Sequence, residues 1–290
     1  MSFRTVLITK QAKLSYKNRF LVVKQGIDEN YIHLSEIDTI MVDSIAVSIS
    51  TYLLKELMDS KINIIFCDEK HNPFGELQTF YSSHNSSKKI ILQTKWNLKQ
   101  KSELWDRIVK NKILNQANLI KHINFDAYLL LIRYIGEVNN GDRTNREAHA
   151  AKVYFNTLFG LNFIRHSSDA INSALNYGYT VLLSMFNKEI NNIGYLTQLG
   201  IHHKNEFNEF NLSCDLMEPF RILIDQFIYK NEIIELDSEY KIKLISLFDE
   251  KFRYDGKRYT LKDIIKLYVK NIFDVLETKK KYKEFIIHEE

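Results

Sequence analysis

The sequence predicts an α+β protein, with a small N-terminal β-rich domain followed by a larger all-α helical C-terminal domain. Short β-branched and aromatic segments fill the first 80 or so residues, whereas apolar residues at helical spacing dominate the rest. A polar segment of small residues, Ser82–Ser87, lies at the change and is typical of a linker. We therefore expect a β-rich domain at 1–82, a linker at 83–88 and an α-helical domain at 89–290.

The N-terminal region alternates short strand patterns with turn residues. Asn18 and Arg19 separate two such patterns and predict a hairpin. Leu53, Leu54 and Leu57 share one face of a helical pattern, which predicts a single helix in this region. The strands are expected at 5–9, 13–17, 20–23, 31–33, 37–42 and 62–66, and the helix at 50–60.

The rest of the chain carries helical patterns almost throughout. Only two prolines and nine glycines occur in 290 residues, which favours long helices. The turn residues Asp255 and Gly256 predict one small hairpin, over 253–259. The helices are expected at 90–120, 127–135, from 146, and at 170–193, 213–230, 238–251 and 260–285.

Composition narrows the class of protein. The formal charge is only +4, so any nucleic-acid binding must come from clustered basic residues and not from the total. Two cysteines in this length give no disulfide framework and fit a reducing cytoplasm. The start lacks a signal-peptide pattern, and no apolar run is long enough for a bilayer. We expect a cytoplasmic protein that does not bind membranes.

Glu147 is the first candidate for a functional carboxylate. Thr144-x-x-Glu147 has the spacing of a capping box, in which the glutamate would only satisfy backbone donors at a helix start. However, Glu147 shares a helical face with Ala151, Tyr154 and Leu158. A carboxylate on an apolar face must be paired or coordinated, so a functional role stays open beside the capping role.

Asp215 and Glu218 show the same two alternatives. Their spacing again resembles a cap, but residues three apart also share one helix face and could both reach a metal ion. Pro219 places Glu218 near a first turn or a bend, because proline removes a helical hydrogen bond. A cap and a ligand are compatible here.

His202 and His203 add a nitrogen ligand type beside Gly200. A histidine with carboxylates from other segments can hold a divalent metal, which suits the cutting or joining of a phosphodiester. Basic residues near these motifs could bind DNA phosphates, although such residues are usually solvated surface. These residues are Arg143, Arg146, Lys152, Arg165, Lys204 and Arg221.

Several of these segments together resemble the CRISPR-associated integrase family, the Cas-one proteins. The segments Asn145–Phe155, Leu175–Leu183, Gly200–His203 and Asp215–Arg221 resemble motifs of the family. The opening segments Arg4–Ile8, Leu14–Asn18 and Ile32–Asp38 are similar to its type II branch. The likeness follows nearly the whole chain in order.

The resemblance implies metal ligands at Glu147, His203 and Glu218, with Mg²⁺ or Mn²⁺ as cofactor. His203 rather than His202 matches the family's position, three residues after the glycine. Asp215 matches a further acidic position at or just outside the direct ligands. The resemblance also implies that the 1–82 domain forms a homodimer and that the 89–290 domain is catalytic and binds the metal and DNA. The implied partners are double-stranded DNA, a second copy in that homodimer, and the small Cas-two protein in a heterohexamer. Other type II adaptation proteins are implied as additional partners.

The implied function is a metal-dependent DNA integrase and endonuclease of CRISPR adaptation. It would join the 3′-hydroxyl ends of short captured duplexes into the CRISPR repeat array. Two alternatives remain from the residues: a stand-alone metal-dependent DNA nuclease, and a non-catalytic DNA-binding scaffold in which Glu147 and Glu218 are only caps.

Overall fold

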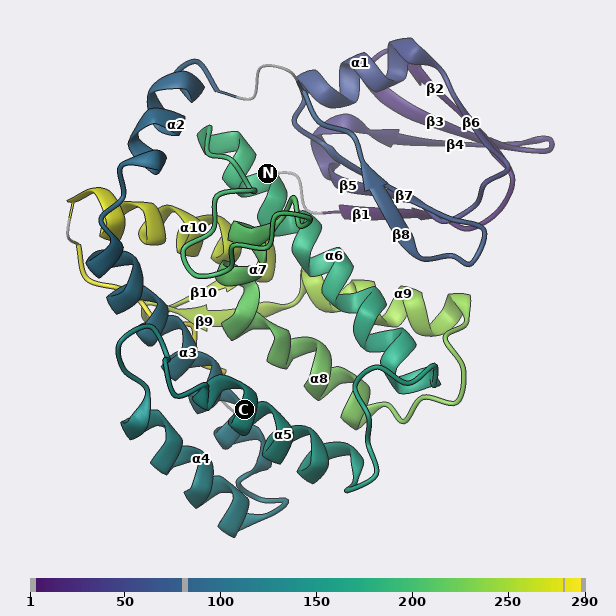
Figure 1. The fold of residues 1–290 in the computed structure, drawn as a ribbon. Coiled ribbons are helices and arrows are strands. Elements are labelled where there is room, and N and C mark those ends of the chain that lie inside the picture. Colours follow the sequence, from purple (N-terminus) through teal and green to yellow (C-terminus); the bar gives the residue numbers. More distant parts are fainter. Residues whose placement is uncertain (1–3, 80–82, 279, 288–290) are drawn as a thin grey trace. The chain divides into compact units, whose positions relative to one another are not determined.

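The computed structural model describes residues 4–79, 83–278 and 280–287 (Figure 1). It confirms the α+β fold class, with a β-rich N-terminal region followed by a helical C-terminal region. Its contacts divide the chain into two compact units. We call the residues before Ser83 together with Asp237–Glu250 the N-terminal unit, and the remainder the helical unit.

Two four-stranded sheets form the N-terminal unit. In the first, parallel pairing joins the first three strands and the last is antiparallel. Its order is β1 (Arg4–Ile8), β5 (Ile37–Val42), β7 (Asn63–Cys67) and β8 (Pro73–Glu76). The second has the order β4 (Asp28–His33), β3 (Phe20–Gln25), β2 (Ala12–Lys17) and β6 (Val47–Ile49). The helix α1 (Thr51–Asp59) precedes β7.

The predicted hairpin over residues 13–23 is confirmed. Lys17 pairs with Phe20 across the β2–β3 turn, and Asn18 and Arg19 have φ angles of 50° and 67°. Two successive positive φ angles match the twist of a two-residue hairpin turn. Apolar side chains from both sheets and α1 then form one core, including Leu14, Leu21, Ile37, Ile40 and Leu53.

The helix α9 (Ser238–Ser246) belongs to the N-terminal unit, whereas the sequence-based division placed this segment in the α domain, 89–290. Lys241 explains the difference. Its ammonium lies 3.5 Å from Oδ1 of the buried Asp43 and donates to the His71 carbonyl at 3.1 Å. A buried ammonium needs such partners, and these two come from loops that follow strands of the first sheet.

Helices make up most of the helical unit. The first of them starts at Ser86, inside the segment expected to be a linker; Ser82 lies outside the described residues. The hairpin expected at 253–259 is present, with Asp255 and Gly256 at positive φ. The elements are α2 (Ser86–Thr94), α3 (Leu98–Ile120), α4 (Phe125–Glu137), α5 (Arg146–Phe159), α6 (Ala170–Ile193), α7 (Asn211–Met217), α8 (Arg221–Lys230), β9 (Lys251–Tyr254), β10 (Lys257–Thr260) and α10 (Leu261–Thr278).

Two of the predicted long helices are each divided, and a third is shorter than expected. The expected helix at 90–120 breaks before Leu98, because the Asn97 side chain accepts the N–H groups of Lys99 and Gln100 and starts a new helix. The expected helix at 213–230 breaks at a 3₁₀ turn, Glu218–Phe220, because Pro219 has no N–H to donate. The last helix ends at Thr278 and not at 285.

The helices of the helical unit pack closely against one another. Figure 1 shows α3, α4 and α5 side by side within the helical unit. A Cβ atom on Gly178 of α6 would lie 2.6 Å from Ile224 Cγ2 of α8, so only glycine permits this approach. Within the described ranges, none of the helices combines the length and apolar character that a membrane span needs.

Candidate active site

Glu147 lies in the first turn of α5, and the backbone there is capped by another residue. The Asp142 carboxylate accepts the N–H groups of Arg146 and Glu147, both at 2.9 Å. The N-cap residue is Asn145, which makes no side-chain capping bond. The capping-box alternative for Thr144 and Glu147 is therefore wrong. The Glu147 carboxylate instead meets the Lys112 ammonium of α3 at 2.6 Å.

Glu218 is 5% exposed and lies in the 3₁₀ turn between α7 and α8. Arg221 Nε donates to its Oε1 at 3.0 Å, and Lys112 Nζ lies 2.6 Å from its Oε2. Burial favours the neutral acid, but Arg221 and Lys112 outweigh it and lower the pKa of Glu218 to about 2. Glu218 is therefore a buried carboxylate that keeps its negative charge.

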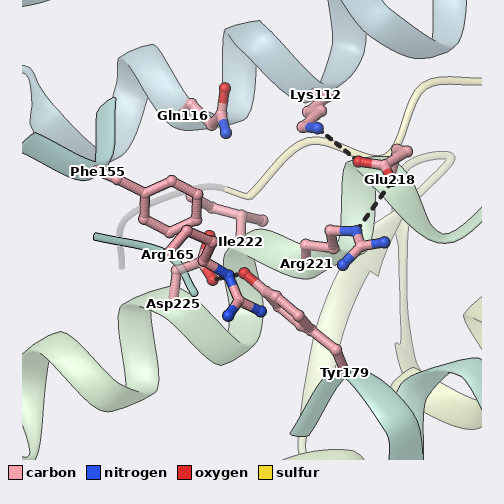
Figure 2. Close-up of a pocket in the computed structure, with 9 residues that line it drawn as sticks. All are labelled: Lys112, Gln116, Phe155, Arg165, Tyr179, Glu218, Arg221, Ile222 and Asp225. Atoms are coloured by element: carbon pink, nitrogen blue, oxygen red, sulfur yellow. Dashed lines mark hydrogen bonds and ion pairs between the residues drawn. The ribbon is translucent and has the colours of Figure 1, made fainter. Parts of the chain in front are cut away.

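Lys112 is thus shared by two carboxylates from different segments, and we call Lys112, Glu147 and Glu218 the carboxylate–lysine cluster. Burial disfavours the ammonium, but Glu147 and Glu218 raise the pKa of Lys112 overall. Glu218 Oε2 is buried and receives no hydrogen bond of acceptable angle, so its contact with Lys112 is electrostatic. Figure 2 shows Glu218 held between Lys112 and Arg221.

A buried amide fixes the distance between Lys112 and Glu218. Asn115 Nδ2, on α3, donates to the Pro219 carbonyl at 3.0 Å and to the Phe285 carbonyl at 2.8 Å. This bond holds the 3₁₀ turn against the helix that carries Lys112. The amide is buried, so the bond has no competition from water.

His203 is oriented by the buried carboxylate of Asp215. Its Nδ1 lies 2.5 Å from Asp215 Oδ1, and the same carboxylate accepts the backbone N–H groups of Ile201, His202 and His203. The hydrogen bond with Asp215 raises the pKa of His203, and Glu218 and Glu147 contribute to the rise. With Nδ1 engaged, Nε2 is the ring nitrogen left for another ligand.

Asp215 is therefore not an N-cap. It lies inside α7, which begins at Asn211, and its two oxygens accept hydrogen bonds from the loop that precedes the helix. Gly200 makes this possible, because a Cβ there would lie 2.4 Å from the His203 carbonyl and 2.8 Å from Asp215 Oδ2. The capping alternative for Asp215 is wrong, and its contacts indicate that it positions His203.

His202 has a different environment from its neighbour. Its ring stacks on Trp105 of α3, with centroids 4.4 Å apart and planes at 4°. Burial lowers the pKa of His202, which keeps it neutral more readily than an ordinary histidine. The two adjacent histidines are thereby separated into one that stacks and one, His203, that pairs with a carboxylate.

A pocket of about 230 Å³ adjoins the carboxylate–lysine cluster. The guanidinium groups of Arg165 and Arg221 lie over the Tyr179 ring, 5.3 and 4.6 Å from its centroid. Asp225, on α8, accepts the hydroxyl hydrogens of Tyr154 and Tyr179. The pocket is lined by Lys112, Gln116, Phe155, Arg165, Tyr179, Glu218, Arg221, Ile222 and Asp225 (Figure 2).

The predicted basic residues do not all gather here. Arg165 and Arg221 line the pocket, whereas Arg146 pairs with Glu137 at 2.8 Å. The remaining three, Arg143, Lys152 and Lys204, are exposed. Two of the six are therefore placed where a phosphate beside the carboxylates would meet them.

The residues fit a divalent cation by their chemistry. Two hard carboxylate oxygens already meet one cationic group at 2.6 Å each, and one of these oxygens is buried without a hydrogen bond. In the part of the chain that the structure describes, no group of three or more His, Cys, Asp or Glu side chains is arranged to hold a metal. The three-ligand site of Glu147, His203 and Glu218 stays a prediction.

The comparisons with known proteins identify the family. The family model described as CRISPR associated protein Cas1 matches residues 5–241. A relative from Neisseria meningitidis serogroup C (strain 8013), named CRISPR-associated endonuclease Cas1, is 36% identical over 226 residues. That match covers 78% of this chain and 74% of the relative. The chain belongs to the CRISPR-associated Cas1 family. The resemblance drawn from the sequence motifs is confirmed.

Solved structures show the same fold at lower sequence identity. A casposase bound to integration product has a TM-score of 0.80 and 18% identity, and the match covers 100% of this chain and 96% of that one. A Cas6-RT-Cas1–Cas2 complex gives a TM-score of 0.75 and 17% identity over 99% of this chain. This Cas1-family chain spans only 36% of that longer chain.

Sequence reasoning missed Lys112 and Asp142 in the candidate site. A signal for Lys112 exists, because it falls on the helical face of Trp105, Ile108 and Val109, all buried. A lysine on such a stripe needs a buried anion as partner. Asp142 gives no comparable signal, since its capping role depends on a left-handed turn at residues 140–142.

Proposed function

We propose that this protein is a divalent-metal-dependent DNA integrase and endonuclease of CRISPR adaptation, which joins 3′-hydroxyl ends of short captured duplexes into the CRISPR repeat array. One observation carries the proposal. Glu147 and Glu218, from separate segments, both contact the Lys112 ammonium. The same two carboxylates help to raise the pKa of His203, the ring of which is oriented by Asp215. Family membership supports the assignment to nucleic-acid chemistry.

Glu147, Glu218 and His203 Nε2 would hold the metal, with Mg²⁺ or Mn²⁺ suited to mixed oxygen and nitrogen ligands. When bound, the ion supplies charge neutralisation at the phosphate and lowers the pKa of the attacking hydroxyl. Asp215 keeps the His203 ring in place through Nδ1. Both of its oxygens are already used, which favours a positioning role over direct ligation.

The chain's own cations would receive the DNA. Arg165 and Arg221 border the pocket beside Glu218, where they can hold a phosphate group. In joining, the incoming 3′-oxygen forms a new bond to phosphorus, and the bond from phosphorus to the 3′-oxygen of the repeat strand breaks. The attacking hydroxyl loses its proton and the released 3′-oxygen gains one. With water in place of the hydroxyl, the same site cleaves DNA.

The proposed partners are double-stranded DNA, a second copy of this chain, and a Cas2 protein that bridges two dimers into a heterohexamer. The similar complex that contains Cas1 and Cas2 supports the choice of Cas2. Further adaptation proteins would contribute the selection of captured DNA.

The contacts of the two glutamates weigh against the scaffold alternative, in which Glu147 and Glu218 are only caps. Asp142 caps α5 while Glu147 pairs with Lys112, and Glu218 pairs with Lys112 and Arg221. The stand-alone nuclease remains the rival, since water and a 3′-hydroxyl would use the same residues. A joining assay separates the two. Labelled duplex ends are incubated with a supercoiled repeat plasmid, Mn²⁺ and the small partner, and covalent transfer of label is measured.

We expect label transfer with the complete mixture and none with a chelator. Glu147→Gln should abolish transfer while circular dichroism shows a folded protein. Metal-dependent cleavage without any transfer, with and without Cas2, would favour the nuclease. No metal-dependent reaction at all would favour the scaffold.

A further inference from the structure

Lys112 occupies the position between the two proposed metal-binding carboxylates. Its ammonium lies 2.6 Å from Glu147 Oε1 and 2.6 Å from Glu218 Oε2. The three side chains are 11%, 23% and 5% exposed, so water screens these charges poorly. A single ammonium therefore serves two carboxylates that come from different segments.

The cluster is charge-balanced as it stands. Two carboxylates, Glu147 and Glu218, face two cations, Lys112 and Arg221. A divalent ion bound by both carboxylates would add two positive charges at the place that the ammonium holds. Two cations cannot share these oxygens at low dielectric without strong repulsion. The ion and the Lys112 ammonium must therefore exclude each other from this position.

We propose that Lys112 is an internal counter-ion of the metal centre: its ammonium holds the Glu147 and Glu218 carboxylates together in the metal-free protein, and divalent-cation binding displaces it. This inference rests on the proposed function, because it requires that the two carboxylates bind a metal. It makes Lys112 a positioning residue that sets both the stability of the empty site and its affinity for the ion.

The adjoining pocket offers the displaced ammonium a destination. Lys112 itself lines this pocket of about 230 Å³, and so does Gln116, one helical turn further along α3. Gln116 Oε1 is buried and has no hydrogen-bond donor, which is an unfavourable state for an amide oxygen. The Asp225 carboxyl is a second acceptor in the same pocket. A four-carbon side chain with three donors can turn from the carboxylates toward these groups.

The test compares the wild-type protein with Lys112→Met, which removes the charge and keeps an unbranched stem. Mn²⁺ binding is measured by titration calorimetry, and the melting temperature is measured in chelator and in saturating Mn²⁺. Lys112→Met should bind Mn²⁺ about tenfold more tightly, or more, a difference of about 1.4 kcal/mol. It should melt at a lower temperature than wild type in chelator, and Mn²⁺ should raise its melting temperature by more.

Lys110→Met is the matched control, because Lys110 lies on the same helix two residues away and outside the cluster. It should change neither the Mn²⁺ affinity nor the difference between the two melting temperatures. If Lys112→Met does not fold, Lys112→Gln, which also lacks the charge, is measured in the same way.

Glu147→Gln separates the inference from the function on which it rests. Failure of wild type to bind Mn²⁺ would overturn both. If wild type binds, Glu147→Gln loses binding, and Lys112→Met binds equally or more weakly, the metal site stands and the counter-ion role of Lys112 is overturned. Equal destabilisation of Lys112→Met with and without Mn²⁺ would also overturn it, because that is the result expected of a residue that only supports the fold.

Discussion

Two buried lysines, one in each unit, show how an ion pair that supports the fold differs from one that belongs to a site. Lys241 and Asp43 are 3% and 1% exposed, and the His71 carbonyl also accepts from Lys241. Lys112 has two carboxylates, and a pocket opens beside it. Burial is common to both. The second carboxylate and the adjoining pocket distinguish the carboxylate–lysine cluster. These two features, and not burial, therefore indicate a catalytic site.

The largest expected effect is a loss of catalytic rate when a carboxylate of the carboxylate–lysine cluster is changed. Glu218→Gln should lower the rates of DNA cleavage and joining by about 10³-fold or more, because a bound metal supplies several kcal/mol of transition-state stabilisation. Rates are measured with labelled DNA and circular dichroism checks the fold. Glu239→Gln, at a side chain that is 75% exposed on α9, should leave both rates unchanged. An active Glu218→Gln protein would remove Glu218 from the proposed site.

The other lysine should matter for stability. Lys241→Met leaves Asp43 buried without its ammonium and should lower the free energy of unfolding by about 3–5 kcal/mol. Urea unfolding followed by fluorescence measures the loss. The double variant Asp43→Asn with Lys241→Met should recover much of it, since no charge is then left unpaired. A single variant as stable as wild type would show that Asp43 needs no counter-ion.

Asp225 extends the comparison to a buried carboxyl that accepts hydrogen bonds from phenols. Burial raises its pKa from the usual 3.8 to about 6, although Tyr179 and Tyr154 donate to it. The folded protein therefore holds this proton more tightly than the unfolded chain does. Its contribution to stability is complete below about pH 4 and is lost as the pH rises through 6.

Asp225→Asn should remove this pH dependence. The unfolding free energy of wild type, relative to Asp225→Asn, should fall by about 2 kcal/mol between pH 4 and pH 7, which is most of the effect of the pKa shift at 1.36 kcal/mol for each pKa unit. Urea unfolding of both proteins at several pH values measures the difference. Parallel curves across this range would mean that Asp225 titrates as it does in water.

The smallest expected effect concerns Asp215, which acts on the site through His203. Asp215→Asn replaces one accepting oxygen by an NH₂ group, which cannot accept the backbone N–H groups that Asp215 binds. The free energy of unfolding should therefore also fall. Activity should fall about 10–100-fold, as for other residues that orient metal ligands. The Mn²⁺ concentration for half-maximal activity should rise, which a purely structural defect would not cause. An unchanged Mn²⁺ requirement would make Asp215 structural.

The fold class followed from composition and periodicity, because strand and helix patterns depend on local spacing. The break at Asn97 was harder to predict, whereas Pro219 had indicated the bend at Glu218. Trp96 and Leu104 were assigned to one continuous helix, whereas the Asn97 side chain accepts from Lys99 and Gln100 and starts a new helix. The place of α9 was not predictable from local pattern, since Lys241 meets Asp43 and His71 through contacts that are long-range in sequence.

Sequence motifs could name candidate site residues but not the residues that contact them. Glu147, Glu218 and His203 were named from their strings, but whether Glu147 was a cap depended on Asp142, which approaches only in the folded turn. Lys112 lies 35 residues from Glu147 along the chain, and no motif connects the two. A prediction of this pair needs the crossing of α3 and α5, which sequence spacing does not contain.

The place of α9 also sets an order of events during synthesis. Lys241 leaves the ribosome 170 residues after His71, so the first sheet is complete long before the ammonium that neutralises Asp43 exists. Until then the buried Asp43 carboxylate has the His71 ring 3.4 Å away but lacks the Lys241 ammonium, and the surface of β1 that α9 contacts is uncovered. A fragment cut after the last strand of this unit would keep that defect permanently. The early part of the chain therefore depends on the late part to finish folding.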